Sequence, residues 1–228
     1  MTAIPSATSL DDLKRLAAVA AHEMGNSLAA IIATAQLLRA SAHDPAVIAR
    51  LADRIETIAR QMVDAISDLK VLGATPRREH GVCLNELVRE AAERVLPIAQ
   101  KDGLRLELDL DPALPTLACD RRGVTRVLIN LIKNALEAAR GATTEPVVVR
   151  SRRRGPFASI TVYNLGKPIP PGVREQIFKP FFSTKPHGSG LGLFISREIV
   201  VDGHNGAISF HSGPRLGTAF CVKLPLEG

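Results

Sequence analysis

A histidine, a glutamate and an asparagine interrupt an apolar segment near the start of the chain, in AAHEMGNSL (residues 20–28). An imidazole with one nitrogen kept unprotonated is a nucleophile toward phosphorus, and an adjacent carboxylate can accept the proton from its other nitrogen. His22 and Glu23 form such a pair. Asn26 falls on the same helical strip as His22, and its amide can orient a water for hydrolysis. The competing interpretation is an ordinary solvated helix face that contains a histidine.

A second polar pair lies in LINLIKNALEAA (residues 128–139), where Asn130 and Asn134 are four residues apart. On a helix both side chains leave the same face. Amide oxygens are suitable ligands for Mg²⁺, which keeps several waters and shares phosphate oxygens. Burying an amide without a hydrogen-bond partner is costly. Two asparagines in an otherwise apolar helix therefore indicate a binding site more than two ordinary surface residues.

Two glycine-containing segments follow. In VYNLGKPIPPG (residues 162–172), Asn164 ends a predicted strand where its side chain could read a base edge, and Gly166 permits close backbone approach. By itself this segment is also a common turn. In GSGLGL (residues 188–193), three glycines precede a predicted helix, and backbone N–H groups in such a loop can bind phosphate. These are Gly188, Gly190 and Gly192.

The N-terminal polar residues are carried by a predicted helical hairpin. Apolar residues spaced by three and four predict a coiled-coil-type helix over residues 9–41, and a stricter three-four alternation from 48 to 72 predicts a second helix that returns antiparallel. At about 100° per residue, His22 points away from the seam into solvent. One hairpin leaves its apolar stripes uncovered, so we expect two copies to form a four-helix bundle.

The rest of the chain predicts a second domain. The polar segment ATPRREHG contains a proline and predicts a linker, which divides the chain into a hairpin (1–73), a linker (74–80) and a C-terminal domain (81–228). Helices are predicted at 85–99, 124–140 and 191–201, with a short one near 173–178, and strands at 104–110, 147–152, 158–163, 207–211 and 218–224. The four clearest strands look antiparallel to their neighbours, which predicts an α/β sandwich and an α+β fold class overall.

Composition and sequence pattern argue against a membrane-spanning or a secreted protein. The 228 residues are 46% hydrophobic and 23% charged, no apolar run is long enough to span a bilayer, and the first residues do not resemble a signal peptide. We therefore expect a cytoplasmic protein without direct membrane insertion. The net charge of +6 suits anionic ligands. The arginine cluster at 150–154 has no interleaved aromatic residues, so we interpret it as an exposed hairpin tip that binds no nucleic acid.

The cysteines and the other histidines do not have the spacing of metal-binding motifs. Three widely spaced cysteines form neither a disulfide framework nor a zinc motif, and are expected to be buried small hydrophobes. The five other histidines lack the spacing of transition-metal ligands. One of them, His187, is interpreted as an exposed loop residue.

The order of these segments resembles that of the sensor histidine kinases. HEMGNSL, INLIKNALEAA, NLGKPIP, IFKPFFSTK and GSGLGL are similar to the H, N, G1, F and G2 boxes of that family. The resemblance implies a dimerisation and histidine-phosphotransfer domain over residues 9–73 and a catalytic ATP-binding domain over about 81–226. It implies that His22 is the phospho-acceptor, Glu23 its general base and Asn26 the phosphatase-assisting residue.

The resemblance also implies a nucleotide site that uses ATP and Mg²⁺. Asn134 would be the magnesium ligand, with Asn130 close to the phosphates and Asn164 and Gly166 at the base. The loop would contribute Thr184, Lys185, Gly188, Gly190 and Gly192. The family acts as homodimers, autophosphorylates the histidine and passes the phosphoryl group to an aspartate on the receiver domain of a response regulator, with phosphatase activity as a further expectation.

Three positions depart from the family pattern. Most members have Asp-x-Gly-x-Gly in the G1 box, where this chain has Asn164 and Pro168, and Ser27 stands where the family usually has proline. An amide lacks the charge that strengthens a hydrogen bond to the adenine amino group, so we expect ATP to bind more weakly than with aspartate. The turned amide would present a donor and admit guanine. The altered box also leaves open an alternative, a dimeric phosphotransfer or scaffold protein with a degenerate ATP site.

Overall fold

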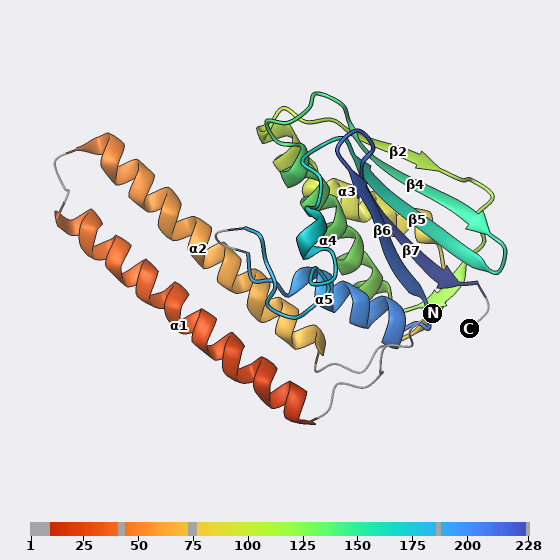
Figure 1. Ribbon diagram of the computed structural model, residues 1–228, viewed down its shortest axis with the longest axis horizontal. Coiled ribbons are helices and arrows are strands. Elements are labelled where there is room, and N and C mark those ends of the chain that lie inside the picture. Colours follow the sequence, from red (N-terminus) through yellow and green to blue (C-terminus); the bar gives the residue numbers. More distant parts are fainter. Residues whose placement is uncertain (1–9, 41–43, 73–76, 186–187, 227–228) are drawn as a thin grey trace. The chain divides into compact units, whose positions relative to one another are not determined.

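The computed structural model describes residues 10–40, 44–72, 77–185 and 188–226 (Figure 1). The chain divides into two compact units. The first contains residues 1–73 together with 179–191, and the second contains residues 74–178 together with 192–228. The second unit is thus built from two separate stretches of sequence.

The first unit is dominated by an antiparallel helical hairpin of α1 (Leu10–Ala40) and α2 (Pro45–Leu72) (Figure 1). Asp44 caps the second helix, because its Oδ1 accepts hydrogen bonds from the backbone N–H groups of Ala46 at 2.9 Å and Val47 at 3.3 Å. Pro45 occupies the first helical position, where its missing N–H is not needed. The two predicted helices are confirmed to within a few residues at each end.

The hairpin buries a narrow seam and leaves other apolar side chains exposed. Leu51 and Ile58, one heptad apart on α2, are buried, and so is Thr34 on α1, whose hydroxyl donates to the Ala30 carbonyl at 2.7 Å. Four large apolar side chains are at least half exposed: Leu28, Ile32, Leu37 and Val63. A single copy of the hairpin therefore leaves these apolar side chains uncovered.

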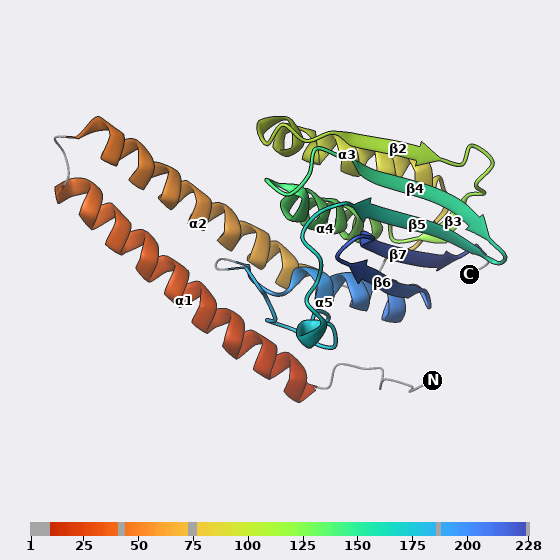
Figure 2. The same cartoon turned by 45° about the horizontal axis from the view of Figure 1, so that its top comes forward.

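The second unit contains a five-stranded sheet in the order β2-β4-β5-β7-β6 (Figure 2). The strands are β2 (Leu106–Leu110), β4 (Val147–Arg154), β5 (Phe157–Asn164), β7 (Gly217–Pro225) and β6 (Ala207–Gly213). Only β2 and β4 run parallel, and the other neighbours are antiparallel. The five predicted strands are present, and β7, the last in sequence, lies between β5 and β6.

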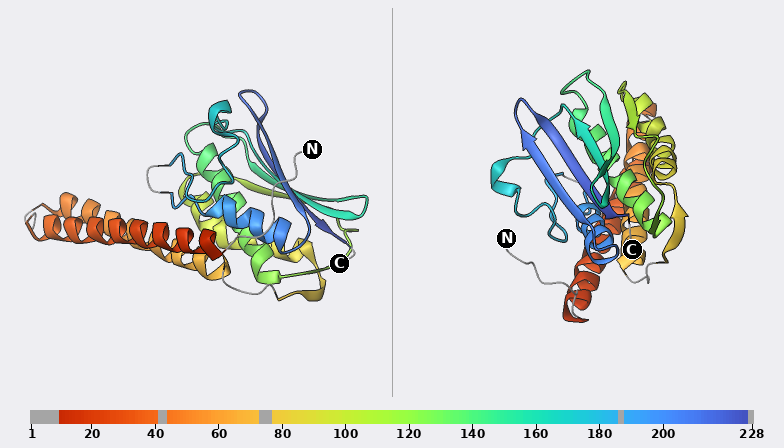
Figure 3. Two further views of the ribbon diagram at one scale, coloured as in Figure 1. Left: turned by 60° about the horizontal axis from the view of Figure 1, so that its bottom comes forward. Right: turned by 90° about the vertical axis from the view of Figure 1, so that its right-hand side faces the viewer.

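Helices cover one face of this sheet (Figure 3). They are α3 (Leu84–Lys101), α4 (Arg121–Ala139) and α5 (Gly192–Arg197). Alternate residues of the strands, such as Ile160 and Val162 on β5, are buried beneath the helices, where α4 contributes Leu128 and Leu131. The period-two pattern of the strands thus meets the apolar stripe of the helix. The predicted α/β sandwich is confirmed.

Three elements differ from the sequence prediction. β1 (Glu79–Val82) and β3 (Leu117–Cys119) pair as a separate two-stranded sheet that was not predicted, and β1 begins inside the segment interpreted as a linker. The short helix predicted near 173–178 is a 3₁₀-helix over Pro171–Val173 followed by turns.

The end of the predicted helix at 191–201 is also different, because α5 continues as a π-helix over Glu198–Asp202. His204 follows the π-helix and contacts it. Its buried ring donates from Nδ1 to the Ile199 carbonyl at 2.6 Å and accepts the Asp120 N–H at Nε2 at 2.8 Å. The imidazole therefore connects the π-helix to the N-cap of α4.

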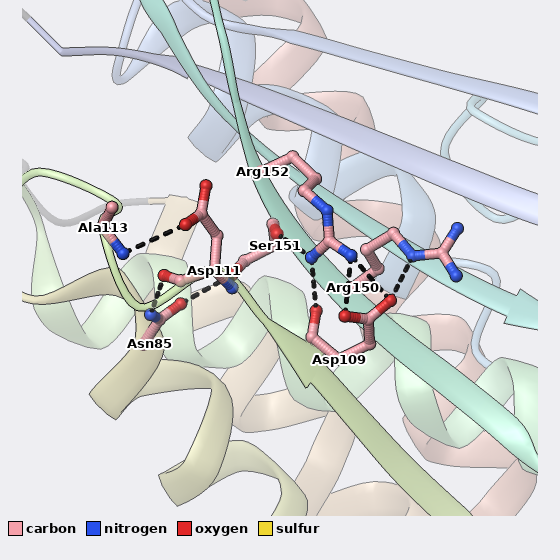
Figure 4. Close-up of polar contacts among 7 residues, drawn as sticks. All are labelled: Asn85, Asp109, Asp111, Ala113, Arg150, Ser151 and Arg152. Atoms are coloured by element: carbon pink, nitrogen blue, oxygen red, sulfur yellow. Dashed lines mark hydrogen bonds and ion pairs between the residues drawn. The ribbon is translucent and has the colours of Figure 1, made fainter.

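The arginine cluster of β4 is tied to the edge strand β2 (Figure 4). Asp109 accepts from Arg150 Nε at 2.6 Å and from Arg152 Nη2 at 2.7 and 2.8 Å. The Arg152 and then the Arg150 hydrogen bonds hold the pKa of Asp109 below its usual range. Arg153 and Arg154, at the end of the strand, are exposed. The predicted hairpin tip is thus confirmed for these two residues, whereas Arg150 and Arg152 are in ion pairs.

A buried polar network holds α3 to the same strands (Figure 4). The Ser151 hydroxyl donates to Asn85 Oδ1 at 2.7 Å and accepts from the Asp111 N–H at 3.0 Å, while Asn85 Nδ2 donates to the Asp111 carbonyl at 2.8 Å. Each of these buried side chains has its hydrogen-bond partners, as buried polar groups usually do.

The three cysteines lie in the second unit as free thiols. Cys119 is fully buried, as predicted, whereas Cys83 and Cys221 are half-buried. Burial raises the pKa of the Cys119 thiol to about 11. Across the described segments, every helix is too short or too polar to cross a bilayer.

Candidate functional site

The first group of predicted site residues lies on α1. His22 and Asn26 are both exposed, one helical turn apart, as the sequence predicts. Between them, an added Cβ at Gly25 would meet no atom within 4 Å, so this part of the helix surface is open. Glu23 is a residue of α1, but its side chain lies outside the described part of the structure. The exposed strip leaves the imidazole accessible to a reactant.

The second group is the asparagine pair on α4. Asn130 Nδ2 donates to the Ser196 hydroxyl at 3.0 Å, and Asn130 Oδ1 receives a long contact from Asn134 Nδ2 at 3.5 Å. The two amides therefore share one face of the helix, as predicted. Because Asn134 turns its nitrogen toward Asn130, its oxygen points away from that residue.

The start of α5 rests directly on this pair. Ser196 Oγ donates to the Gly192 carbonyl at 2.8 Å, and a Cβ added to Gly192 would lie 2.4 Å from Asn130 Oδ1. Only glycine fits at this position without displacing the amide. Ser196, which is buried, was not recognised in the sequence, although its place four residues after Gly192 is compatible with a hydroxyl-to-carbonyl bond within the helix.

Asn164, the last residue of β5, is the third candidate. Its side chain is 2% exposed, and its Nδ2 is buried without a hydrogen-bond partner in the described chain. Gly217 on β7 (φ +66°) approaches its backbone so closely that a Cβ there would lie 2.2 Å from the Asn164 carbonyl oxygen. The strand end thus presents an amide whose donor needs an acceptor.

Gly166 makes the close backbone approach that its sequence context predicts, but its neighbour is a helix end. A Cβ on Gly166 would lie 2.2 Å from the Ala138 carbonyl oxygen, and the Lys167 N–H donates to the same oxygen at 2.9 Å. The loop after β5 is therefore attached to the last turn of α4, one turn beyond Asn134.

The glycine loop forms part of the first compact unit, whereas Asn130, Asn134, Asn164, Gly166 and Gly192 are in the second. Within the loop, Thr184, Lys185 and Gly188 are exposed. Gly190 has a positive φ of 65°, and a Cβ there would lie 2.3 Å from the Phe181 carbonyl carbon. The loop is therefore narrow at its base. His187 lies outside the described residues.

The residues of the second unit fit a purine nucleotide. The unpartnered amide donor of Asn164 suits a base edge, and glycine at position 192 lets α5 begin close to Asn130 without displacing its amide. No group of three His, Cys, Asp or Glu side chains in the described segments is arranged to hold a metal ion. Any magnesium bound here would therefore rely on amide oxygens, phosphates and water.

Two family models match the chain. Residues 12–73 match the His Kinase A (phospho-acceptor) domain, and residues 119–228 match the histidine kinase-, DNA gyrase B- and HSP90-like ATPase. The first match contains His22 and Asn26. The second contains Asn130, Asn134 and Asn164.

Curated relatives and solved structures agree with these matches. The chain is 34% identical over 225 residues to the sensory histidine kinase/phosphatase NtrB of Salmonella typhimurium, covering 91% of this chain and 60% of the relative, so it spans about 60% of that protein's length. It is 35% identical to the C4-dicarboxylate transport sensor protein DctB of Rhizobium meliloti, covering 96% of this chain and 35% of the relative.

Among solved structures, the catalytic domain of histidine kinase ThkA is 32% identical, with a TM-score of 0.60, and the match covers 67% of this chain and 99% of that one. A structure of ThkA in complex with the response regulator protein TrrA is 26% identical with a TM-score of 0.73, covering 95% of this chain and 63% of that one. Together with the two domain matches, these similarities show that the chain belongs to the sensor histidine kinase family.

Proposed function

We propose that this chain is the core of a two-component histidine kinase, which phosphorylates His22 from Mg-ATP and transfers the phosphoryl group to an aspartate of a response regulator. The observation that carries the proposal is the exposed imidazole of His22 on α1 in a chain that also has the Asn130–Asn134 face of an ATPase-type domain. Because the reaction consumes ATP, we place it in the cytoplasm.

In the first step, a ring nitrogen of His22 attacks the γ-phosphorus. The new N–P bond forms as the bond from phosphorus to the leaving oxygen of ADP breaks, and Glu23 accepts the proton from the other ring nitrogen. The exposure of His22 supports this role, because a nucleophile in the hairpin seam could not be reached. In the second step, the carboxylate of the receiver aspartate displaces His22 from phosphorus.

In the ATP-binding domain, Asn134 would hold Mg²⁺ through its side-chain oxygen, and bound magnesium would neutralise phosphate charge. Asn130 orients Asn134 and fixes the start of α5 through Ser196. Asn164 and Gly166 would lie at the base, and the loop residues Thr184, Lys185, Gly188, Gly190 and Gly192 would lie at the phosphates. We assign residues 1–73 to the phosphotransfer domain and 81–228 to the catalytic domain.

Two further parts of the proposal concern partners. The exposed apolar side chains Leu28, Ile32, Leu37 and Val63 support a homodimer in which two hairpins form a four-helix bundle. The similarity to ThkA, which was solved with a response regulator, supports a receiver domain as the second partner. Asn26, exposed one turn after His22, would orient water in a phosphatase reaction on that partner.

The proposal is tested with ATP labelled at the γ-phosphate. We expect acid-labile label on the wild-type chain and none on His22→Gln, while His211→Gln, at another exposed histidine in β6, keeps full labelling. Labelling of His22→Gln equal to that of the wild type would refute the assignment. A folded wild-type chain that takes no label from any nucleotide would instead support the scaffold alternative.

A further inference from the structure

Asn164 stands out among the buried polar side chains of the second unit. Of the described residues, only two have a buried side-chain polar atom without a hydrogen-bond partner, Thr125 at its hydroxyl and Asn164 at Nδ2. Thr125 lies near the start of α4, whereas Asn164 lies where a strand ends in a loop. A buried amide N–H without an acceptor is unfavourable, so an acceptor is expected at the strand end.

The neighbours of Asn164 do not supply that acceptor. The residue opposite it on β7 is Thr218, and the Thr218 hydroxyl is paired with Ser212 Oγ at 2.7 Å. Ser212 Oγ also accepts the Ile169 N–H at 2.8 Å. The backbone of Gly217 packs against that of Asn164, where an added Cβ would lie 2.2 Å from the Asn164 carbonyl oxygen. The described residues therefore supply no acceptor for Asn164 Nδ2.

The side chain of residue 164 can distinguish purines by their 6-substituent. Adenine has an amino group there, which donates, whereas guanine and hypoxanthine have a carbonyl oxygen, which accepts. A carboxylate can only accept and thus selects adenine, but an amide offers a donor and an acceptor on one carbon. Rotation about the last side-chain torsion, which has broad preferences, can bring either atom toward the base.

We propose that Asn164 removes the preference for adenine and that this chain binds 6-oxopurine nucleotides about as well as adenine nucleotides, with Asn164 Nδ2 donating to the 6-oxygen. The inference rests on the proposed nucleotide site and adds its base specificity. Asn164 is then a specificity-determining residue, and the substrate class widens from ATP to purine nucleoside triphosphates with either 6-substituent.

The test measures binding of ADP, IDP and GDP with Mg²⁺ by titration calorimetry, which is independent of phosphoryl transfer. In the wild-type chain we expect the Kd values of ADP and IDP to agree within about threefold. In Asn164→Asp, ADP binds at least as tightly while IDP weakens by about tenfold to hundredfold, because two acceptors then face each other. If the Kd of GDP is close to that of IDP, guanine nucleotides are the natural 6-oxopurine ligands. If GDP binds weakly while IDP binds tightly, inosine nucleotides are.

Asn164→Leu is the matched control. It removes the donor and the acceptor, so ADP and IDP should weaken by the same factor, about tenfold, and their ratio should stay near one. A merely structural role for Asn164 would leave the ratio unchanged in Asn164→Asp as well, which would overturn the inference. A wild-type preference for ADP of tenfold or more would also overturn it. Failure of a folded wild-type chain to bind any of the three would refute the nucleotide site itself.

Discussion

Gly192→Ala is expected to destabilise the second unit, because the added methyl group would clash with the Asn130 side chain on α4. An added Cβ would lie 2.4 Å from Asn130 Oδ1 and 3.1 Å from Asn130 Nδ2, about 1 Å short of ordinary van der Waals contact with the oxygen. Neither side yields easily, because Asn130 is hydrogen-bonded to Ser196 and Ser196 to the Gly192 carbonyl. Overpacking of this kind typically costs about 1–3 kcal/mol of folding free energy.

The expected loss is measured by urea unfolding. The chain has one tyrosine and no tryptophan, and Tyr163 lies on β5, so tyrosine fluorescence reports on the sheet of the second unit. We expect Gly192→Ala to lower the free energy of unfolding by about 1–2 kcal/mol, since a small gain in helix propensity offsets part of the overpacking. Gly172→Ala is the control, because a Cβ there meets nothing within 4 Å.

A double-mutant cycle decides whether the contact with Asn130 is the cause. Asn130→Ala removes the amide and loses the hydrogen bond to Ser196, at a cost of about 1 kcal/mol. In that background Gly192→Ala has room for its methyl group, so most of its effect should disappear and the two changes should be strongly non-additive. An equal effect of Gly192→Ala in both backgrounds would refute the reasoning.

Three further predictions concern the second unit. Thr125→Val should stabilise the fold by up to about 1 kcal/mol in the same urea assay, because it removes a buried hydroxyl without a partner; a clear loss of stability would contradict this. With a pKa raised to about 11, Cys119 should resist alkylation of the native chain at pH 8 while Cys83 and Cys221 react, as peptide mapping would show. The arginines lower the pKa of Asp109, so the stability from these ion pairs is present above about pH 4 and is lost as pH falls through the folded pKa. The stability difference between wild type and Asp109→Asn should therefore shrink on acidification from about pH 6 to pH 3, and a constant difference would count against the pairs.

The long elements could be predicted from the sequence because their patterns extend over many residues. The hairpin helices repeat their apolar spacing over several heptads, and β5 and β7, eight and nine residues long, bury alternate residues over most of their length. β1 and β3 have four and three residues, too few for a pattern, and form only because they pair with each other. The π-helix is joined through His204 to a helix start more than eighty residues earlier in the sequence, a contact that no local pattern predicts.

The same distinction applies to the site. The shared face of Asn130 and Asn134 follows from helix geometry and is visible in their spacing. Ser196 and Thr218 could not be recognised from the sequence, because only tertiary structure brings them to the site. Ser196 contacts α4, and Thr218 lies opposite Asn164 in the β5–β7 register. The sequence identified Asn164 as a departure from a family pattern, but only its burial shows that the amide donor is left without a partner.

The position of β7 has a consequence for how the sheet is completed. Until residues 217–225 are available, β5 has an open edge with Ile160 and Val162 in it, and β6 has no strand to pair with. Chains interrupted before this point would expose an unpaired apolar edge, the kind of surface on which strands of separate molecules add to one another. Premature termination within the last strand should therefore yield insoluble aggregates and not a smaller folded domain.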